Sequence, residues 1–204
     1  EGGRAYLDKI IQAPYDLPQI EFRTLSRYFT TQLDAVLNAH KHGHFNVADW
    51  QNIYQLGIFP LIRTPRDAKR LCNAVQMALG FVGEEIAIVD LVALETIRVL
   101  RPALFEKIVE HAGLLAPSPL MLDRHADTRR DAIERKRYDD IVASAPGYEV
   151  PVKQLLKRLF PASMRISDNT FYGAEFLKTW RKERKVAHPE ILNFYLEHEF
   201  SAGV

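Results

Sequence analysis

The segment at residues 86–100 most constrains how this chain can fold. It is apolar on nearly every side, and its polar members are Asp90, Glu95, Thr96 and Arg98. A helix of this kind has no broad face suited to water, so other elements must surround it. The sequence therefore predicts a helical bundle with residues 86–100 near its centre.

Apolar residues spaced three or four apart, as in an amphipathic helix, recur along most of the chain. Further helices are expected at residues 20–40, 47–56, 64–82, 102–111, 123–142, 152–160, 175–185 and 189–200. Residues 58–62 are expected to be an apolar connector, and residues 166–172 are expected to be irregular. No β-alternation and no fixed-period repeat is found. The expected fold class is all-α, an irregular multi-helix bundle.

One short extended segment is expected near the N-terminus, at residues 9–14. Pro14 and Pro18 exclude a continuing helix there and bias their neighbours toward extended conformations. The run Ala116-Pro117-Ser118-Pro119 is the best candidate boundary, because its two prolines fit neither a helix interior nor a central strand. We therefore expect two units, residues 1–116 and residues 117–204.

Composition and motifs exclude several classes of protein. Hydrophobic residues make up 47% and charged residues 26% of the 204 residues, which excludes collagen-like and disordered chains. The lone cysteine, Cys72, cannot form an internal disulfide and falls on an expected buried face, where a thiol is inert. The sequence has no G-x-S-x-G nucleophile motif, no GxxxxGK loop and no apolar run long enough to cross a bilayer.

The run Thr64-Pro65-Arg66-Asp67 is the clearest helix start in the sequence. A hydroxyl residue at the N-cap, a proline at the first position and an acid at the third fit a capping box. Arg66 then lies at the positive end of the helix dipole, which disfavours a cation by up to about 1 kcal/mol. Either a bound phosphate or an acid of the chain, such as Asp67, Asp90 or another acidic residue, should compensate.

Arg70, one turn further along the same helix, is the second candidate for anion contact. Its structural alternative is an ion pair with Asp90 or Glu95. Arg4 and Lys9 flank the expected extended segment, where a basic residue either senses nucleotide or only solvates the end of a strand.

A basic surface is expected in the C-terminal half, where residues 150–188 hold 9 lysines and arginines against 3 acids. Its densest part comprises Lys178, Arg181, Lys182, Arg184 and Lys185. Tyr172 and Trp180 lie close by in sequence, and a positive surface with aromatic platforms suits nucleic acid. The alternative is a solvated helix with Trp180 packed into the core.

The spacing His40-x-His42-x-His44 suggests metal ligands, but Gly43 is expected to end the helix there. No rigid pair of imidazoles one turn apart is then formed, so we favour histidines placed at a helix C-terminus and expect no metal site.

Several stretches together resemble the post-catalytic part of KAP-family P-loop NTPases. They are Tyr6-Leu7-Asp8-Lys9-Ile10-Ile11-Gln12 with Pro14 and Pro18, Thr64-Pro65-Arg66-Asp67-x-x-Arg70-Leu71-x-Asn73, Val89-Asp90-Leu91-x-x-Leu94-Glu95-x-x-Arg98, Lys157-Arg158-Leu159-Phe160-Pro161, and the run from Arg181 to Pro189. The order and spacing of these motifs, more than any one of them, carry the resemblance.

The resemblance implies that a nucleotide-binding core with Walker A and B motifs precedes Glu1 in a longer parent. Residues 1–116 would be the helical lid region that follows the last core strand, and residues 117–204 a C-terminal helical extension. ATP and Mg would bind the parent, and this chain alone would bind neither and hydrolyse nothing. Arg66, Arg70 and Arg4 would be the residues nearest the nucleotide, with Arg66 similar to a lid arginine that reaches the γ-phosphate.

The resemblance also implies partners, a location and a role. The first partner is the N-terminal core of the same protein, while a protein partner, nucleic acid and self-association are left open. A cytoplasmic location is expected, at the inner face of the membrane where the parent carries membrane helices, with no membrane contact by this segment. Bacterial members are associated with phage exclusion, which implies a role in antiviral defence. The alternative is a stand-alone helical module whose basic C-terminal surface binds nucleic acid or an acidic protein.

Overall fold

The computed structural model describes residues 20–40, 45–82, 85–122, 128–168, 170 and 172–201. All regular elements among these residues are helical, which confirms the expected all-α class. In chain order they are α2 (Phe22–Ala39), α3 (Val47–Ile53), the π-helical turn η1 (Tyr54–Ile58), the 3₁₀ turn η2 (Phe59–Leu61), α4 (Pro65–Val82), α5 (Ile88–Leu100), α6 (Pro102–Glu110), α7 (Ala112–Leu115), α8 (Pro119–Leu122), α9 (Thr128–Ala143), α10 (Glu149–Leu159), the 3₁₀ turn η3 (Pro161–Ser163), α11 (Met164–Ser167), α12 (Glu175–Lys182) and α13 (Pro189–Ser201). The extended segment expected at residues 9–14 lies outside the described residues.

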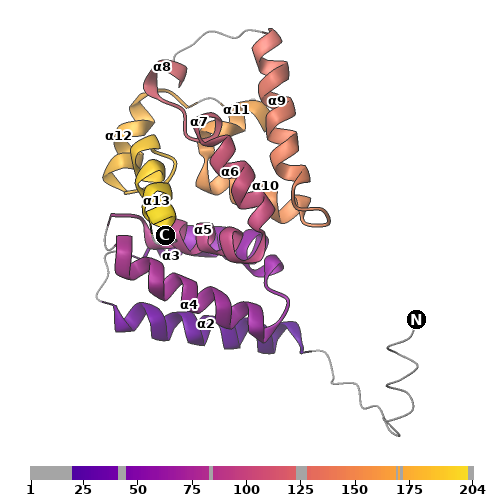
Figure 1. Ribbon diagram of the computed structural model, residues 1–204, viewed down its shortest axis with the longest axis vertical. Coiled ribbons are helices and arrows are strands. Elements are labelled where there is room, and N and C mark those ends of the chain that lie inside the picture. The colour runs from indigo at the N-terminus through magenta and orange to yellow at the C-terminus, as the bar shows by residue number, and fades with distance from the viewer. Residues whose placement is uncertain are drawn as a thin grey trace, which may run out of the picture.

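Helix α5 lies at the centre of the molecule, as the sequence predicts. In Figure 1 it runs between the pair formed by α2 and α4 and a second group that contains α6 and α9 to α13. Its residues Leu91, Leu94 and Ile97 are completely inaccessible to solvent. Because α5 is covered on nearly every side, it joins the two groups of helices into one core.

Helices α2 and α4 pack side by side along one edge of the molecule (Figure 1). Leu25, Phe29 and Leu33 lie one turn apart on α2 and are all buried, so they form one apolar face. Cys72 lies on the buried face of α4, and burial raises the pKa of its thiol to about 11. The expectation that Cys72 packs on a buried face is confirmed.

The path between α3 and α4 differs from the expected helix and connector. The helix expected at residues 47–56 does not stop there, because a π-helical turn and a 3₁₀ turn continue it to Leu61. A Cβ atom at position 57 would lie 3.0 Å from the side chain of Leu155 on α10. This distance is at the lower limit of the contacts that Cβ atoms make in proteins. Gly57 therefore serves close packing against α10 and does not end a helix.

Two other expectations need correction. Residues 166–172 are not wholly irregular, because Met164–Ser167 form α11, whose Ile166 is buried. An ion pair of 2.5 Å between Arg165 and Glu134 joins α11 to α9. Helix α10 begins at Glu149, earlier than expected, because Pro151 falls in the first turn, where its missing N–H is not needed.

Residues on both sides of the expected boundary at 116 share one hydrophobic core, which extends from Leu25 on α2 to Leu196 on α13. A smaller cluster packs Ala162, Leu177, Trp180 and Ala187 together. The division into residues 1–116 and 117–204 stays a prediction.

Helix α12 ends in a Schellman motif in which arginine takes the usual place of glycine. The backbone N–H of Lys185 donates to the carbonyl of Trp180 at 2.9 Å, and that of Arg184 donates to the carbonyl of Arg181 at 3.1 Å. Arg184 has a φ of 56°, in the left-handed region that favours residues without a Cβ atom. The turn thus carries backbone strain at Arg184.

We expect Arg184→Gly to be more stable than Arg184→Ala by about 0.5–1 kcal/mol. Both variants lose the arginine side chain, but only the alanine variant keeps the Cβ atom that strains this conformation. Glycine makes the unfolded chain more flexible, which offsets part of the stability gained by removing the strain. Urea unfolding of the two variants measures the difference. Equal stabilities, or a more stable alanine variant, would contradict the assignment.

Candidate functional site

The N-terminus of α4 carries the capping box that the sequence predicts. The Thr64 hydroxyl accepts the N–H of Asp67 at 3.1 Å. The Asp67 carboxylate accepts the N–H of Thr64 at 3.1 Å and that of Arg63 at 3.2 Å. Asp67 thus satisfies backbone donors at the helix start, and its charge is favourable at the positive end of the dipole.

Arg66 lies at the second position of α4, and its side chain is exposed. It makes no hydrogen bond or ion pair with any residue in the described part of the chain. Neither acid suggested as its structural partner serves that purpose, because Asp67 caps the helix and Asp90 accepts a backbone N–H elsewhere. The Arg66 guanidinium is therefore accessible to an external anion, and its contact with nucleotide stays a prediction.

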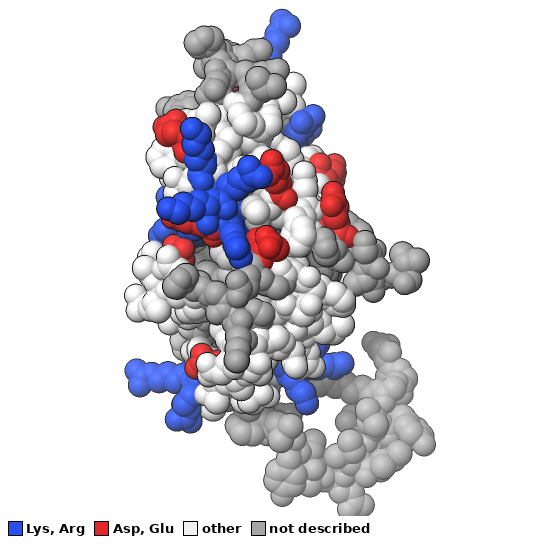
Figure 2. Space-filling model, turned by 90° about the vertical axis from the view of Figure 1, so that its left-hand side faces the viewer, with Lys and Arg blue, Asp and Glu red and all other residues white. Residues whose placement is uncertain are grey.

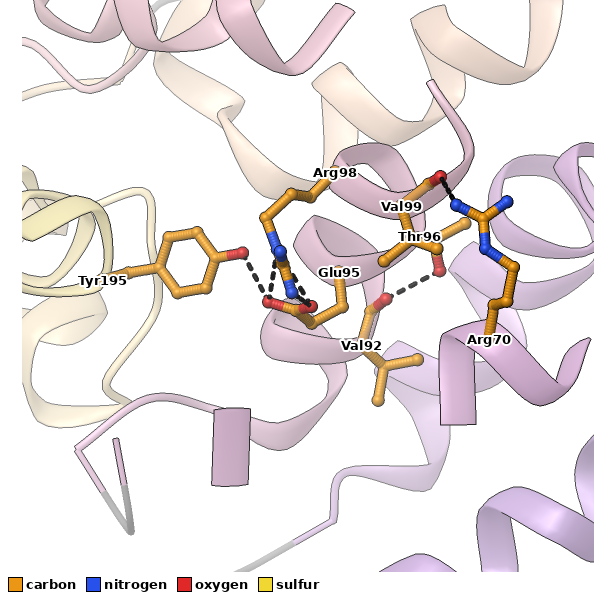
Figure 3. Close-up of polar contacts among 7 residues, drawn as sticks. All are labelled: Arg70, Val92, Glu95, Thr96, Arg98, Val99 and Tyr195. Atoms are coloured by element: carbon orange, nitrogen blue, oxygen red, sulfur yellow. Dashed lines mark hydrogen bonds and ion pairs between the residues drawn. The ribbon is translucent and has the colours of Figure 1, made fainter. Parts of the chain in front are cut away.

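Arg70 is not paired with Asp90 or Glu95, which corrects its structural alternative. Its Nη2 donates to the carbonyl of Val99 near the C-terminus of α5, at 3.4 Å. Figure 3 shows this contact on one side of α5, while the partners of Glu95 lie on the other. A cation at the C-terminal end of a helix is favourable, so Arg70 ties α4 to α5.

Glu95 is fully buried in the middle of α5 and receives two kinds of donor (Figure 3). Arg98, one turn further along α5, lies 2.5 Å from its Oε2. The hydroxyl of Tyr195, on α13, donates to its Oε1 at 2.7 Å. The buried charge is thus compensated, and α13 is fastened to α5.

Asp90 is the second buried acid of α5. Its Oδ2 accepts the N–H of Val186, which follows α12, at 3.0 Å. Burial raises the pKa of Asp90 to about 7, although the Val186 bond and the charge of Lys185 act in the opposite direction. Beside it, Lys185 Nζ lies 3.0 Å from Asp49 on α3 and 3.5 Å from Glu183.

The connection between α12 and α13 is held to α5 at a further point, because Ala87 N–H donates to the carbonyl of Arg184 at 2.9 Å. The sequence offers Arg66 and Arg70 as alternative partners of Asp90 and Glu95, but the structure supplies other donors. A buried acid signals that a donor must be near, yet Val186 and Tyr195 lie about a hundred residues away, with sequence separations of 96 and 100.

A second contact that the sequence does not reveal connects the start of α4 with α10. Arg63 Nη1 donates to the hydroxyl of Tyr148 at 3.3 Å. The guanidinium of Arg101, between α5 and α6, stacks over the Tyr148 ring with its Cζ 3.7 Å from the ring centroid. Tyr148 immediately precedes α10, so these contacts link three parts of the chain.

The basic residues of α12 gather on one face of the molecule, with acidic side chains beside them (Figure 2). Lys178, Arg181, Lys182 and Arg184 are exposed. Arg181 pairs with Glu190 at 2.9 Å, whereas Lys185 is half-buried against Asp49. The cations are thus brought together, but acids neutralise part of their charge.

Trp180 is buried on the opposite face of α12, in the smaller hydrophobic cluster. Its ring centroid lies 5.7 Å from that of Tyr172 and 6.1 Å from that of Phe176. The packing alternative is confirmed for Trp180, which cannot stack on a nucleic-acid base in this position.

Of the remaining sequence candidates, the structure describes only His40. Arg4, Lys9, His42 and His44 lie outside the described residues. His40 follows the end of α2, where its Nδ1 contacts the carbonyl of Val36 at 3.0 Å. Across the described ranges, no group of three His, Cys, Asp or Glu residues could hold a metal ion. The same ranges contain no helix with the length and apolar character needed to span a bilayer.

We expect the stability of the protein to depend on the ionisation of Asp90. Unfolded aspartate has a pKa of about 3.9, whereas burial raises that of folded Asp90 to about 7. Between these values the folded protein keeps a proton that the unfolded chain has lost, so the free energy of unfolding contributed by this group falls as pH rises. In Asp90→Asn the side chain does not titrate and can still accept the Val186 N–H.

The measurement is urea unfolding of both proteins from about pH 5 to about pH 8. The variant should gain stability relative to the wild type as pH rises, while the exposed α9 variant Asp131→Asn should show no such trend. A constant difference between Asp90→Asn and wild type would refute the assignment.

Residues 1–79 match the family model described as the KAP family P-loop domain. The matched range includes Arg66 and Arg70 and ends within α4. No curated protein and no solved structure matches the chain. The resemblance noted in the sequence is thus confirmed over this range, because residues 1–79 match the KAP family P-loop domain.

Proposed function

We propose that this chain is the lid and C-terminal helical region of a KAP-type P-loop ATPase, in which it couples the nucleotide state of the parent's core to a partner. Nucleotide in that core would engage Arg66 through its γ-phosphate. Helices α4 and α5 would then move together, and the C-terminal helices would pass this movement to the partner.

The observation that carries the proposal is the position of Arg66 within the matched range. Its guanidinium is exposed at a helix start and makes no polar contact with the described residues. Guanidinium groups form strong, paired hydrogen bonds with phosphate oxygens. A cation held where the helix dipole opposes it, and without an internal acid partner, is suited to an anion that arrives from outside.

The contacts of α4 support a coupled movement. Arg70 reaches the Val99 carbonyl on α5, and Arg63 reaches Tyr148 at the start of α10. A displacement of the start of α4 would therefore disturb its contacts with α5 and with the C-terminal helices.

ATP and Mg belong to the proposed parent. The described residues supply no metal-binding group, and the sequence has no GxxxxGK loop, so this chain would contribute Arg66 to phosphate but not the phosphate cradle. We include a role in bacterial antiviral defence in the proposal, and it rests on the family resemblance.

The test is ATP hydrolysis by the full parent protein carrying Arg66→Ala. Loss of a charged hydrogen bond to the transferred phosphate should lower kcat by at least about tenfold. Lys69→Ala is the matched control, because Lys69 is exposed on α4, three residues further along, and should leave kcat unchanged. Equal loss in both variants, or no loss in Arg66→Ala, would refute the role of Arg66. Turnover by the purified 204-residue chain that Arg66→Ala abolishes would refute the lid assignment itself.

A second candidate is a stand-alone module whose basic surface on α12 binds nucleic acid or an acidic protein. The exposed cluster of Lys178, Arg181, Lys182 and Arg184 favours it, whereas the burial of Trp180 removes one stacking platform.

This candidate predicts that the 204-residue chain binds generic DNA or RNA with an affinity that falls steeply as salt increases. Changing Arg181, Lys182, Arg184 and Lys185 to glutamine should abolish binding, because the phosphate contacts are lost. Fluorescence anisotropy with a labelled oligonucleotide measures both effects. Absence of binding at low salt, or binding that persists in the glutamine variant, would eliminate it.

A further inference from the structure

A cavity of about 240 Å³ lies where the two halves of the chain meet. Asp49 of α3 and Asp90 of α5 line it from the N-terminal half. Lys157 and Arg158 of α10 and Lys185 line it from the C-terminal half. The volume is below the range of about 300–1,000 Å³ that drug-sized ligands occupy, so the cavity suits a molecule smaller than a nucleotide.

Two of the cations are already paired with acids. Lys185 Nζ lies 3.0 Å from Asp49, and Lys157 Nζ lies 3.0 Å from Asp168. Lys185 therefore compensates Asp49 directly and leaves Asp90 without an ion-pair partner among the described residues.

Asp90 is an incompletely satisfied acceptor at the buried side of the cavity. It is 6% exposed, and the Val186 N–H is its hydrogen-bond donor within the described residues. A carboxylate has room for several donors on its two oxygens, so Asp90 can accept more from a ligand in the cavity. An ammonium group would also supply the missing positive charge.

Arg158 offers the complementary group. It is exposed, lines the same cavity and makes no hydrogen bond or ion pair with the described part of the chain. Its planar guanidinium matches a carboxylate with two parallel hydrogen bonds. The walls of the cavity also include the apolar side chains of Val89 and Met164.

A ligand of a single charge would not satisfy this arrangement. A simple anion would face the Asp90 carboxylate, and a simple cation would face three basic side chains. We propose that the cavity binds a small zwitterion of amino-acid size, with its ammonium group at Asp90, its carboxylate at Arg158 and its apolar part against Val89 and Met164. Because residues from both halves contribute, occupancy would stabilise the junction between them. This proposal does not depend on nucleotide binding by the parent.

The test is isothermal titration of the 204-residue chain with the standard amino acids and with ε-aminocaproate. At least one zwitterion should bind saturably. The control ligands are analogues that carry only one of the two charges. For L-leucine they are isoamylamine, which lacks the carboxylate, and isocaproate, which lacks the amine, and analogous pairs exist for the other side chains. Each single-charge analogue should bind at least about tenfold more weakly, as expected for the loss of a charged hydrogen bond.

Variants locate the site on the protein. Asp90→Asn and Arg158→Gln should each weaken binding by at least about tenfold. Lys153→Gln is the matched control, because Lys153 is exposed on α10 but does not line the cavity. The Lys153→Gln protein should bind the zwitterion with the affinity of the wild type. Circular dichroism would reveal whether Asp90→Asn alters folding. Arg158 is a surface residue, so Arg158→Gln tests the site even in that case.

Three results would overturn the proposal. They are the absence of binding by every zwitterion, equal affinity of a zwitterion and its single-charge analogues, and unchanged affinity in Arg158→Gln.

Discussion

The structure depends on burying two carboxylates inside one apolar helix. Asp90 and Glu95 lie on α5, the element covered on nearly every side, and water cannot solvate either of them freely. An unsatisfied buried charge is strongly destabilising, so donors must reach both groups from elsewhere in the chain. Those donors are the Val186 backbone and the Tyr195 hydroxyl, both in the C-terminal region. The central helix therefore dictates where the last helices lie.

Polar contacts connect the start of α4 with the C-terminal helices through α5. Arg70 joins α4 to α5, Asp90 joins α5 to the segment between α12 and α13, and Glu95 joins α5 to α13. The contacts of Tyr148 with Arg63 and Arg101 provide a second route from α4 to α10. A switch that acts at Arg66 would thus have physical connections to the surfaces where a partner could bind.

Local chemistry predicted much of the fold, and long-range contacts account for what it missed. The Thr64 and Asp67 capping box and the central place of α5 follow from residue types and spacing, because they depend on neighbours in sequence. The close packing of Gly57 against Leu155 could not be predicted, since the two residues are almost a hundred positions apart in the sequence. In the candidate site, the sequence left both alternatives for Arg66 open, and it did not reveal the donors to Asp90 and Glu95 because they are distant in sequence.

The bond between Tyr195 and Glu95 has a consequence for how shortened forms of this protein would behave. A chain trimmed ahead of α13 would keep every residue of the central helix but would strip Glu95 of its hydroxyl donor and expose the apolar surface beneath Leu192 and Leu196. Such a product would be a target for proteolysis and aggregation, although the sequence removed contains none of the residues proposed to sense phosphate. The stability of the whole bundle therefore depends on the presence of α13.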